Sequence, residues 1–386
     1  MKQRMRRTAL CLAAALCVGM GGGARAAEEL PFSIEAKAAI LVDAATGQVI
    51  WEKNADEQLD PAGMAKLMSA LLVSEALESG TLDPEGGLSV SAAAAATGGM
   101  SAFLTRGESY GVQELFRAMM MISANDATVV LAEALCGSQE GFAAAMQERA
   151  AQFSLDAKFV NPTGHKAQGQ TMSARDGAKL ACELAKHPAA LEYASVYSGV
   201  LIHPGGRTTE LVNPNRLVRF YSGCDGLSTG SNNAALYCGA FTAKRGTDRF
   251  VAVIFGAPNA DARAQGAQKL LDYAFANYQS VIVIEEGKGV AKDVPVAGGR
   301  KRSVHGVAGE GVSLLLKKGE AGQIEKEPVI FEELSAPVEK GQTIGELTVK
   351  KDGEVVARVP IVAYERVEKA SVSALLRVEL LDWLRR

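Results

Sequence analysis

The sequence lacks the patterns that mark metal centres and several common catalytic sites. Its four histidines do not have the spacing of metal ligands, and no H-E-x-x-H or G-x-S-x-G motif occurs. The glycine-rich stretch 306–311 is not G-x-G-x-x-G, and we expect it to form a loop. We therefore expect neither a metal nor an organic cofactor. The formal net charge of −3 gives no reason to expect a nucleic-acid partner.

Long apolar runs are scarce as well. The one near the N-terminus, residues 8–20, is shorter than the roughly 20 apolar residues that cross a bilayer. It follows a basic cluster at 2–7 and precedes the small-x-small sequence Ala24-Arg25-Ala26. This order is typical of a secretory signal peptide, so we predict that residues 1–26 are removed on export. A membrane-spanning helix is the alternative.

Cysteine is sparse, and no C-x-x-C pair occurs. Without the signal peptide, the chain keeps Cys136, Cys182, Cys224 and Cys238. The last two flank the turn-rich segment 228–233, between two predicted strands. In an oxidising compartment they could form a disulfide across a hairpin. The alternative is a pair of small buried thiols.

Apolar periodicity divides most of the chain into strands and helices. The length of 386 residues favours two or three domains. We predict strands in 38–53, 236–242 and 250–255, and helices over 61–79, 112–121, 127–135, 141–153, 173–187 and 262–278. Strands on either side of a helical block are typical of an α+β fold, with helices packed on an antiparallel sheet. We assign residues 31–280 to this domain.

The composition changes near residue 281. Residues 281–366 are rich in Val, Gly, Lys and Glu and have short apolar runs, which predicts a small all-β domain. Residues 367–386 regain helical periodicity, with an apolar face that includes Trp383 and basic residues elsewhere. Such an amphipathic helix can lie in a membrane interface. It could equally dock on its own protein or form a dimer contact.

Three short segments carry a resemblance to a known family. Residues 60–68, Asp-Pro-Ala-Gly-Met-Ala-Lys-Leu-Met, resemble the S-x-x-K motif of penicillin-binding proteins. Ser123-Ala124-Asn125 resembles their S-x-N motif, and Asp225 to Gly230 resembles their K-T-G strand. Order and spacing match the low-molecular-mass, serine-type D-alanyl-D-alanine carboxypeptidases. The flanking stretches 38–54, 161–164, 173–176, 211–216 and 336–341 are similar to this family too.

The resemblance implies a β-lactamase/penicillin-binding-protein-like fold and an acyl-transfer site. In S-x-x-K, the serine and lysine lie one helical turn apart, so a desolvated Lys66 could take the serine proton. Ser123 would relay that proton, and Asn125 would hold the substrate amide. The K-T-G strand, here Ser228-Thr229-Gly230, would bind the substrate. That substrate would be the peptidoglycan stem peptide ending in D-Ala-D-Ala.

The sequence departs from the motifs at two decisive positions. Gly63 stands where the nucleophilic serine belongs, and Ser228 replaces the carboxylate-binding lysine. Ala65 also replaces the usual threonine. Loss of a triad-type nucleophile costs on the order of 10⁶ in rate, or about 8 kcal/mol of barrier. We therefore predict a non-hydrolytic family member that binds wall peptides or a partner protein.

Other interpretations stay open at this stage. The chain could be an active carboxypeptidase in which Gly63 is an engineered change, or in which Ser69 or Ser101 substitutes as nucleophile. It could also be a structural protein with an empty cleft. Without a neighbouring serine, Lys66 could be an ordinary helix lysine, and Ser123 and Asn125 could serve only as helix cap and turn.

The resemblance also bears on location. It implies that the tail is the family's amphipathic membrane anchor. Together with the signal peptide, this predicts an exported, extracytoplasmic protein attached to the outer face of the cytoplasmic membrane.

Overall fold

The structure is a computed structural model that describes residues 30–320, 322–331 and 334–371. The predicted signal peptide, 1–26, lies outside these residues, as do 372–386 of the predicted tail helix. Within the described ranges, none of the helices combines the length and the apolar character that a membrane crossing requires.

An antiparallel sheet forms the centre of the N-terminal part. Its strand order is β2-β1-β9-β8-β7. The bounds are β1 Ala38–Asp43, β2 Val49–Lys53, β7 Cys224–Asn232, β8 Leu236–Arg245 and β9 Asp248–Ala257. Both faces of β1 are buried, which explains its nearly continuous apolar sequence. The strands predicted within 38–53, 236–242 and 250–255 are confirmed.

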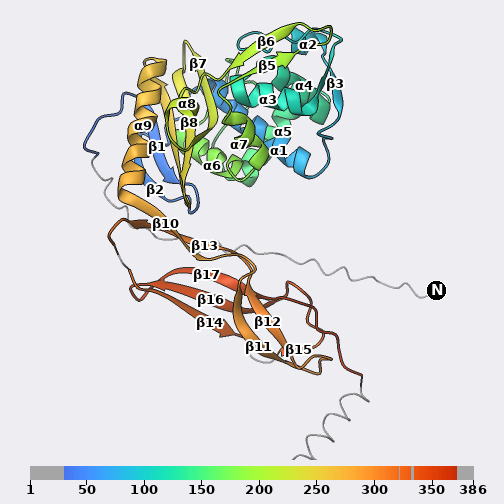
Figure 1. The fold of residues 1–386 in the computed structure, drawn as a ribbon, viewed down its shortest axis with the longest axis vertical. Coiled ribbons are helices and arrows are strands. Elements are labelled where there is room, and N and C mark those ends of the chain that lie inside the picture. The colour runs from blue at the N-terminus through green and yellow to red at the C-terminus, as the bar shows by residue number, and fades with distance from the viewer. Residues whose placement is uncertain (1–29, 321, 332–333, 372–386) are drawn as a thin grey trace, which may run out of the picture.

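Helices cover both faces of this sheet. Alternate strand residues serve the two sides: Ile40 and Val253 pack with the helical block, whereas Leu41 and Ile254 pack with α9. Figure 1 shows α9 along one side and the other large helices opposite it. The main helices are α1 Lys66–Glu78, α3 Val112–Ile122, α4 Asn125–Cys136, α5 Gln139–Gln152, α6 Ala174–Leu184 and α9 Ala260–Asn277.

Shorter elements complete this part, and the sequence analysis did not predict them individually. They are η1 Ala62–Ala65, α2 Ala92–Ala95, α7 Pro188–Ala194 and α8 Leu217–Phe220, with the strand pairs β3 Gly87–Ser89 with β4 Ser109–Gly111 and β5 Ser198–Ile202 with β6 Thr208–Val212. The predicted helix 61–79 thus begins as the 3₁₀ turn η1 and becomes α-helical at Lys66.

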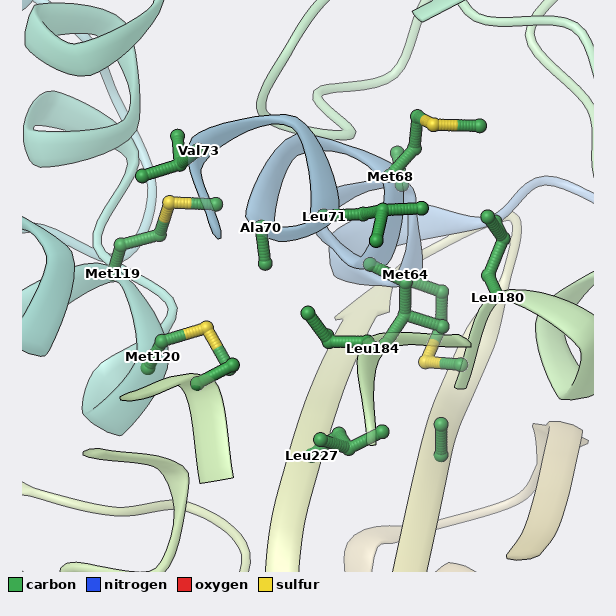
Figure 2. Packing of buried hydrophobic residues seen from close by; sticks show 14 of the residues in the cluster. Met64, Met68, Ala70, Leu71, Val73, Met119, Met120, Leu180, Leu184 and Leu227 are labelled. Atoms are coloured by element: carbon green, nitrogen blue, oxygen red, sulfur yellow. The ribbon is translucent and has the colours of Figure 1, made fainter. Parts of the chain in front are cut away.

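The helix α1 is buried on most of its surface. Met68 and Leu71 project from it into the core, and Figure 2 shows them among side chains from neighbouring elements, such as Met119 of α3 and Leu184 of α6. Each fully buried side chain of this size contributes roughly 1.5–3 kcal/mol. This packing fixes the start of α1 at Lys66 and the preceding turn η1, where Gly63 lies.

The C-terminal part is entirely β in the described residues. β10 Tyr278–Ile284 pairs with β13 Val312–Lys317. A six-stranded sheet has the order β14-β16-β17-β12-β11-β15. Its strands are β11 Gly289–Ala297, β12 Ser303–Ala308, β14 Ile324–Ile330, β15 Leu334–Ser335, β16 Thr343–Lys351 and β17 Glu354–Ala363. The predicted α+β fold followed by an all-β segment is confirmed.

Hydrogen bonds tie β10 to the N-terminal sheet. The Ser280 hydroxyl donates to the buried Asp43 carboxylate at 2.5 Å, and the Ser280 amide donates to Asp248 at 2.7 Å. The chain therefore passes directly from α9 into β10 while remaining bonded to the ends of β1 and β9.

Two expectations for the C-terminal part are corrected. Residues 306–308 of the glycine-rich stretch lie in β12, because Gly306 pairs with Ala363 of β17. A helix does not begin at residue 367: Val367 and Lys369 form bridges to Val338 and Gly299 instead.

Candidate active site

The three motif segments meet at one cleft of about 540 Å³. Gly63 lies in η1, and Lys66 is the first residue of α1. Ser123 ends α3 in a left-handed conformation, with φ of 60°, and Asn125 begins α4. The lining residues predicted from sequence are Gly63, Lys66, Ser123, Asn125, Thr229 and Gly230.

Position 63 is packed tightly against β7. A Cβ atom there would lie 2.9 Å from the Thr229 carbonyl oxygen and 3.1 Å from the Gly230 Cα atom. It would also lie 3.4 Å from the Ser123 hydroxyl oxygen. Glycine is thus the residue that permits this approach of η1 to β7. A serine at this position would require the β7 backbone to shift.

Ser228 turns towards the same backbone. Its half-buried hydroxyl donates a hydrogen bond to the Gly63 carbonyl at 3.3 Å. Ser228 is not among the residues that line the cleft. Of the three residues predicted to bind substrate on β7, the structure therefore brings Thr229 and Gly230 to the cleft and ties Ser228 to η1.

Lys66 is buried, with 4% of its surface exposed, and its ammonium group donates to the Thr163 carbonyl at 2.6 Å. Burial lowers the pKa of Lys66 to about 7, and the Asp126 carboxylate partly offsets this by attraction. A lysine with this pKa is a competent proton acceptor near neutral pH. At position 63, however, no hydroxyl is present from which it could take a proton.

Asn125 is the second polar group buried in the wall. Its side-chain amide donates to the Gly98 carbonyl at 2.7 Å, and its backbone amide donates to Met100 at 2.7 Å. Asn125 is only 6% exposed, yet its side-chain carbonyl oxygen has no hydrogen-bond partner. A buried acceptor without a donor is costly, so it is suited to receive an N–H group from a ligand.

The two candidate substitute nucleophiles are engaged elsewhere. The Ser69 hydroxyl is fully buried and donates to the Pro162 carbonyl at 2.7 Å. The Ser101 hydroxyl donates to the Asp126 carboxylate at 2.6 Å. Neither serine lines the cleft.

The loop 161–170 forms one wall of the cleft and was not assigned a role from sequence. The Asn161 side chain accepts from the amides of Thr163 and His165 and donates to the His165 carbonyl. Gly164 has φ of +76°, and a Cβ there would lie 1.8 Å from the Ala62 carbonyl oxygen. Glycine at 164 therefore allows this loop to rest directly on η1.

Arg263 of α9 is a further cleft residue that the sequence analysis missed. It is 5% exposed, donates to the Cys238 carbonyl at 3.2 Å, and has an unpartnered Nε atom. Burial lowers the pKa of Arg263 to about 10. It forms no ion pair with the acidic residues that the structure describes. A signal was present in the sequence, because Arg263 falls on the same helical face as Ala267, Leu270 and Ala274.

The disulfide suggested for Cys224 and Cys238 is not formed. Both are buried free thiols, as the alternative proposed. The β7–β8 register places Cys224 opposite Ala243 and Cys238 opposite Gly230. The hairpin turn lies at 233–235, nearer Cys238 than the sequence suggested, so the two cysteines lie at different levels of the ladder.

Sequence comparisons identify the family of this chain. Residues 24–259 match the D-alanyl-D-alanine carboxypeptidase family, and residues 278–369 match the C-terminal domain of penicillin-binding protein 5. The carboxypeptidase DacF of Bacillus subtilis is 38% identical over 351 residues, covering 90% of each chain. DacC of Escherichia coli is 32% identical, covering 87% of this chain and 85% of the relative.

Comparison with solved structures gives the same family of folds. Penicillin-binding protein 5 from Haemophilus influenzae superposes with a TM-score of 0.74 at 26% identity, covering 89% of this chain and all of that one. The chain thus has the fold of a low-molecular-mass penicillin-binding protein. It belongs to the D-alanyl-D-alanine carboxypeptidase family of peptidoglycan metabolism.

The contact between η1 and β7 predicts the effect of adding one methyl group. Gly63→Ala should lower the free energy of unfolding by roughly 1–3 kcal/mol, because the new Cβ atom overlaps backbone atoms that cannot rotate away. Thermal and urea unfolding of the purified variant measure this loss.

Gly266→Ala is the matched control. A Cβ there would lie at an ordinary 3.5 Å from Ile254 and Ile34, inside helix α9 where alanine is favoured over glycine. It should be neutral or stabilising. Equal stability of the two variants would show that position 63 is not tightly packed.

Lys66→Met should change how stability depends on pH. Between pH of about 7 and the ordinary lysine value of 10.5, the unfolded chain binds a proton that the native protein does not. Wild-type stability should therefore rise with pH in this range, by at most about 1.4 kcal/mol per pH unit. The methionine variant lacks this slope, which thermal unfolding at several pH values between about 7 and 10.5 would detect.

Lys158→Met serves as the control, since Lys158 is exposed. It should keep the wild-type slope. If Lys66→Met also kept that slope, Lys66 would titrate as an ordinary surface lysine.

Proposed function

We propose that this chain is a non-hydrolytic member of its family that binds the D-Ala-D-Ala end of wall stem peptides. The proposal rests on the glycine at position 63 and its close packing against β7. Position 63 lacks a nucleophile, and the Thr229 carbonyl lies against the site where a serine Cβ would stand. Ser69 and Ser101 are engaged in other hydrogen bonds, so neither supplies a replacement.

The remaining cleft keeps groups that suit peptide binding. The Asn125 side-chain oxygen is a buried acceptor without a partner, and it matches a peptide N–H. Arg263 is a buried cation without an acidic partner in the described residues, and it matches a peptide carboxylate. Unpaired buried groups of these two kinds destabilise an empty cleft and are satisfied when a peptide enters.

The sequence also suggests where in the cell envelope the protein acts. We propose that residues 1–26 direct export and that the tail holds the protein at the outer face of the cytoplasmic membrane. Peptidoglycan stem peptides are accessible there, and DacF and DacC are named D-alanyl-D-alanine carboxypeptidases. Retention of the cleft without its nucleophile would convert such an enzyme into a binding protein.

A fluorescent penicillin should leave the wild-type protein unlabelled, because no serine is positioned to form an acyl-enzyme. Denaturing gel fluorescence and intact-protein mass spectrometry detect a covalent adduct directly. The variant Gly63→Ser with Ser228→Lys, which supplies both missing groups, is run beside it. A stable acyl adduct on the wild-type chain would overturn the non-hydrolytic assignment.

Arg263→Met should abolish the preference of the cleft for a free C-terminus. The wild type should bind N-acetyl-D-Ala-D-Ala roughly 10-fold or more tighter than the C-terminal amide of the same peptide, since a hydrogen bond to a charged group contributes roughly 1.5–3 kcal/mol. In the variant the two peptides should bind equally. Isothermal titration gives both ratios.

Thermal unfolding controls for damage to the fold. Replacing a buried, unpaired cation with an apolar side chain of similar length should leave the melting temperature unchanged or raise it. A stable variant that still discriminates acid from amide would assign carboxylate binding to another residue.

A further inference from the structure

The charged side chains that line the cleft are mostly basic. They comprise Lys66, Lys166, Arg216 and Arg263, against the single carboxylate of Asp261 among the described lining residues. Arg216 lies 3.5 Å from Asp261 and is paired with it. Lys66 is buried and engaged by the Thr163 carbonyl. The cations that remain for a ligand are therefore Arg263 and Lys166.

Lys166 and Arg263 belong to opposite walls. Arg263 donates to the Cys238 carbonyl, and Cys238 is the cross-strand neighbour of Gly230 on the sheet side. Lys166 follows His165, whose ring lies 3.6 Å from the position of a Cβ on Gly99. Gly99 in turn adjoins the side chain of Asn125 on the helical side.

A connected path of cleft residues joins the two walls. The position of a Cβ on Gly63 lies close to Ser123 on the helical side and to Thr229 and Gly230 on the sheet side. A peptide lying along β7 therefore has a cation at each side of the cleft and the Asn125 acceptor among the lining groups.

The backbone before Lys166 is fixed, whereas its side chain is exposed. The His165 carbonyl accepts from Asn161 at 2.8 Å and from Gln170 at 3.1 Å, and the His165 amide donates to Asn161. The Lys166 side chain has no ion-pair partner in the described residues. It can thus reach an anionic group without first breaking an internal contact.

We propose that the cleft selects peptides with two anionic groups, a C-terminal carboxylate held on the sheet side by Arg263 and a second carboxylate met by Lys166. This inference rests on the proposed peptide binding and specifies its ligand class. Lys166 acts as the specificity-determining residue for the second group. Because the Lys166 side chain is solvated, its contribution is modest compared with that of Arg263.

The test compares two tripeptides that differ by one charge, N-acetyl-Glu-D-Ala-D-Ala and N-acetyl-Gln-D-Ala-D-Ala. Wild-type protein should bind the Glu peptide up to roughly five-fold tighter at low salt, the upper end expected for an exposed ion pair. The preference should shrink as salt is added. Isothermal titration of the full chain gives both dissociation constants.

Lys166→Gln should remove the preference without changing the affinity for the Gln peptide. Lys166→Arg should keep the preference, and Lys166→Glu should reverse it. Lys244→Gln carries the same charge change on an exposed residue of β8 that does not line the cleft, and it should behave as the wild type.

The outcomes separate this inference from the proposed function. If both peptides bind the wild type equally, or if Lys166→Gln keeps the wild-type preference, peptide binding stands and the second anionic subsite is overturned. If neither peptide binds at any accessible concentration, the proposed function fails, and the inference fails with it.

Discussion

The carbonyl of Thr229 lies against the backbone of Gly63, only 2.9 Å from the point where any other residue would place its Cβ atom. The rest of the cleft is arranged around this contact. Ser228 adds a hydrogen bond across the same junction, and Gly164 lets the loop 161–170 rest on the other side of η1. Glycines at positions 63 and 164 thus let β7 and the loop 161–170 pack closely against η1.

This arrangement separates the two requirements of a hydrolase, which are binding and covalent chemistry. The groups suited to peptide binding, Asn125 and Arg263, come from α4 and α9 and do not depend on a side chain at position 63. The covalent step of the family motif depends on a hydroxyl that position 63 lacks. In the proposed function, the chain has lost turnover and keeps the unpaired buried groups that suit ligand binding.

Much of the fold and part of the site could be predicted from the sequence. Continuous apolar runs located β1 and β9, which are buried on both faces, and apolar periodicity located the larger helices. The motif segments identified Lys66, Ser123 and Asn125 as neighbours. The packing of Gly63 against β7 could not be predicted, since it depends on backbone positions 166 residues apart. Arg263 was missed although its place on a buried helical face marked it, and the Cys224–Cys238 pairing failed because it requires the exact strand register.

The burial of Lys66 makes the charge of the cleft depend on pH near neutrality. With a pKa of about 7, Lys66 exchanges its proton in a range where Arg263, whose pKa is about 10, keeps its own. Entry of an anionic peptide stabilises the protonated form, so binding and proton uptake are thermodynamically coupled, and each must strengthen the other by the same factor. In the proposed binding function, the cleft would therefore hold an anionic ligand more tightly as the surrounding medium becomes more acidic.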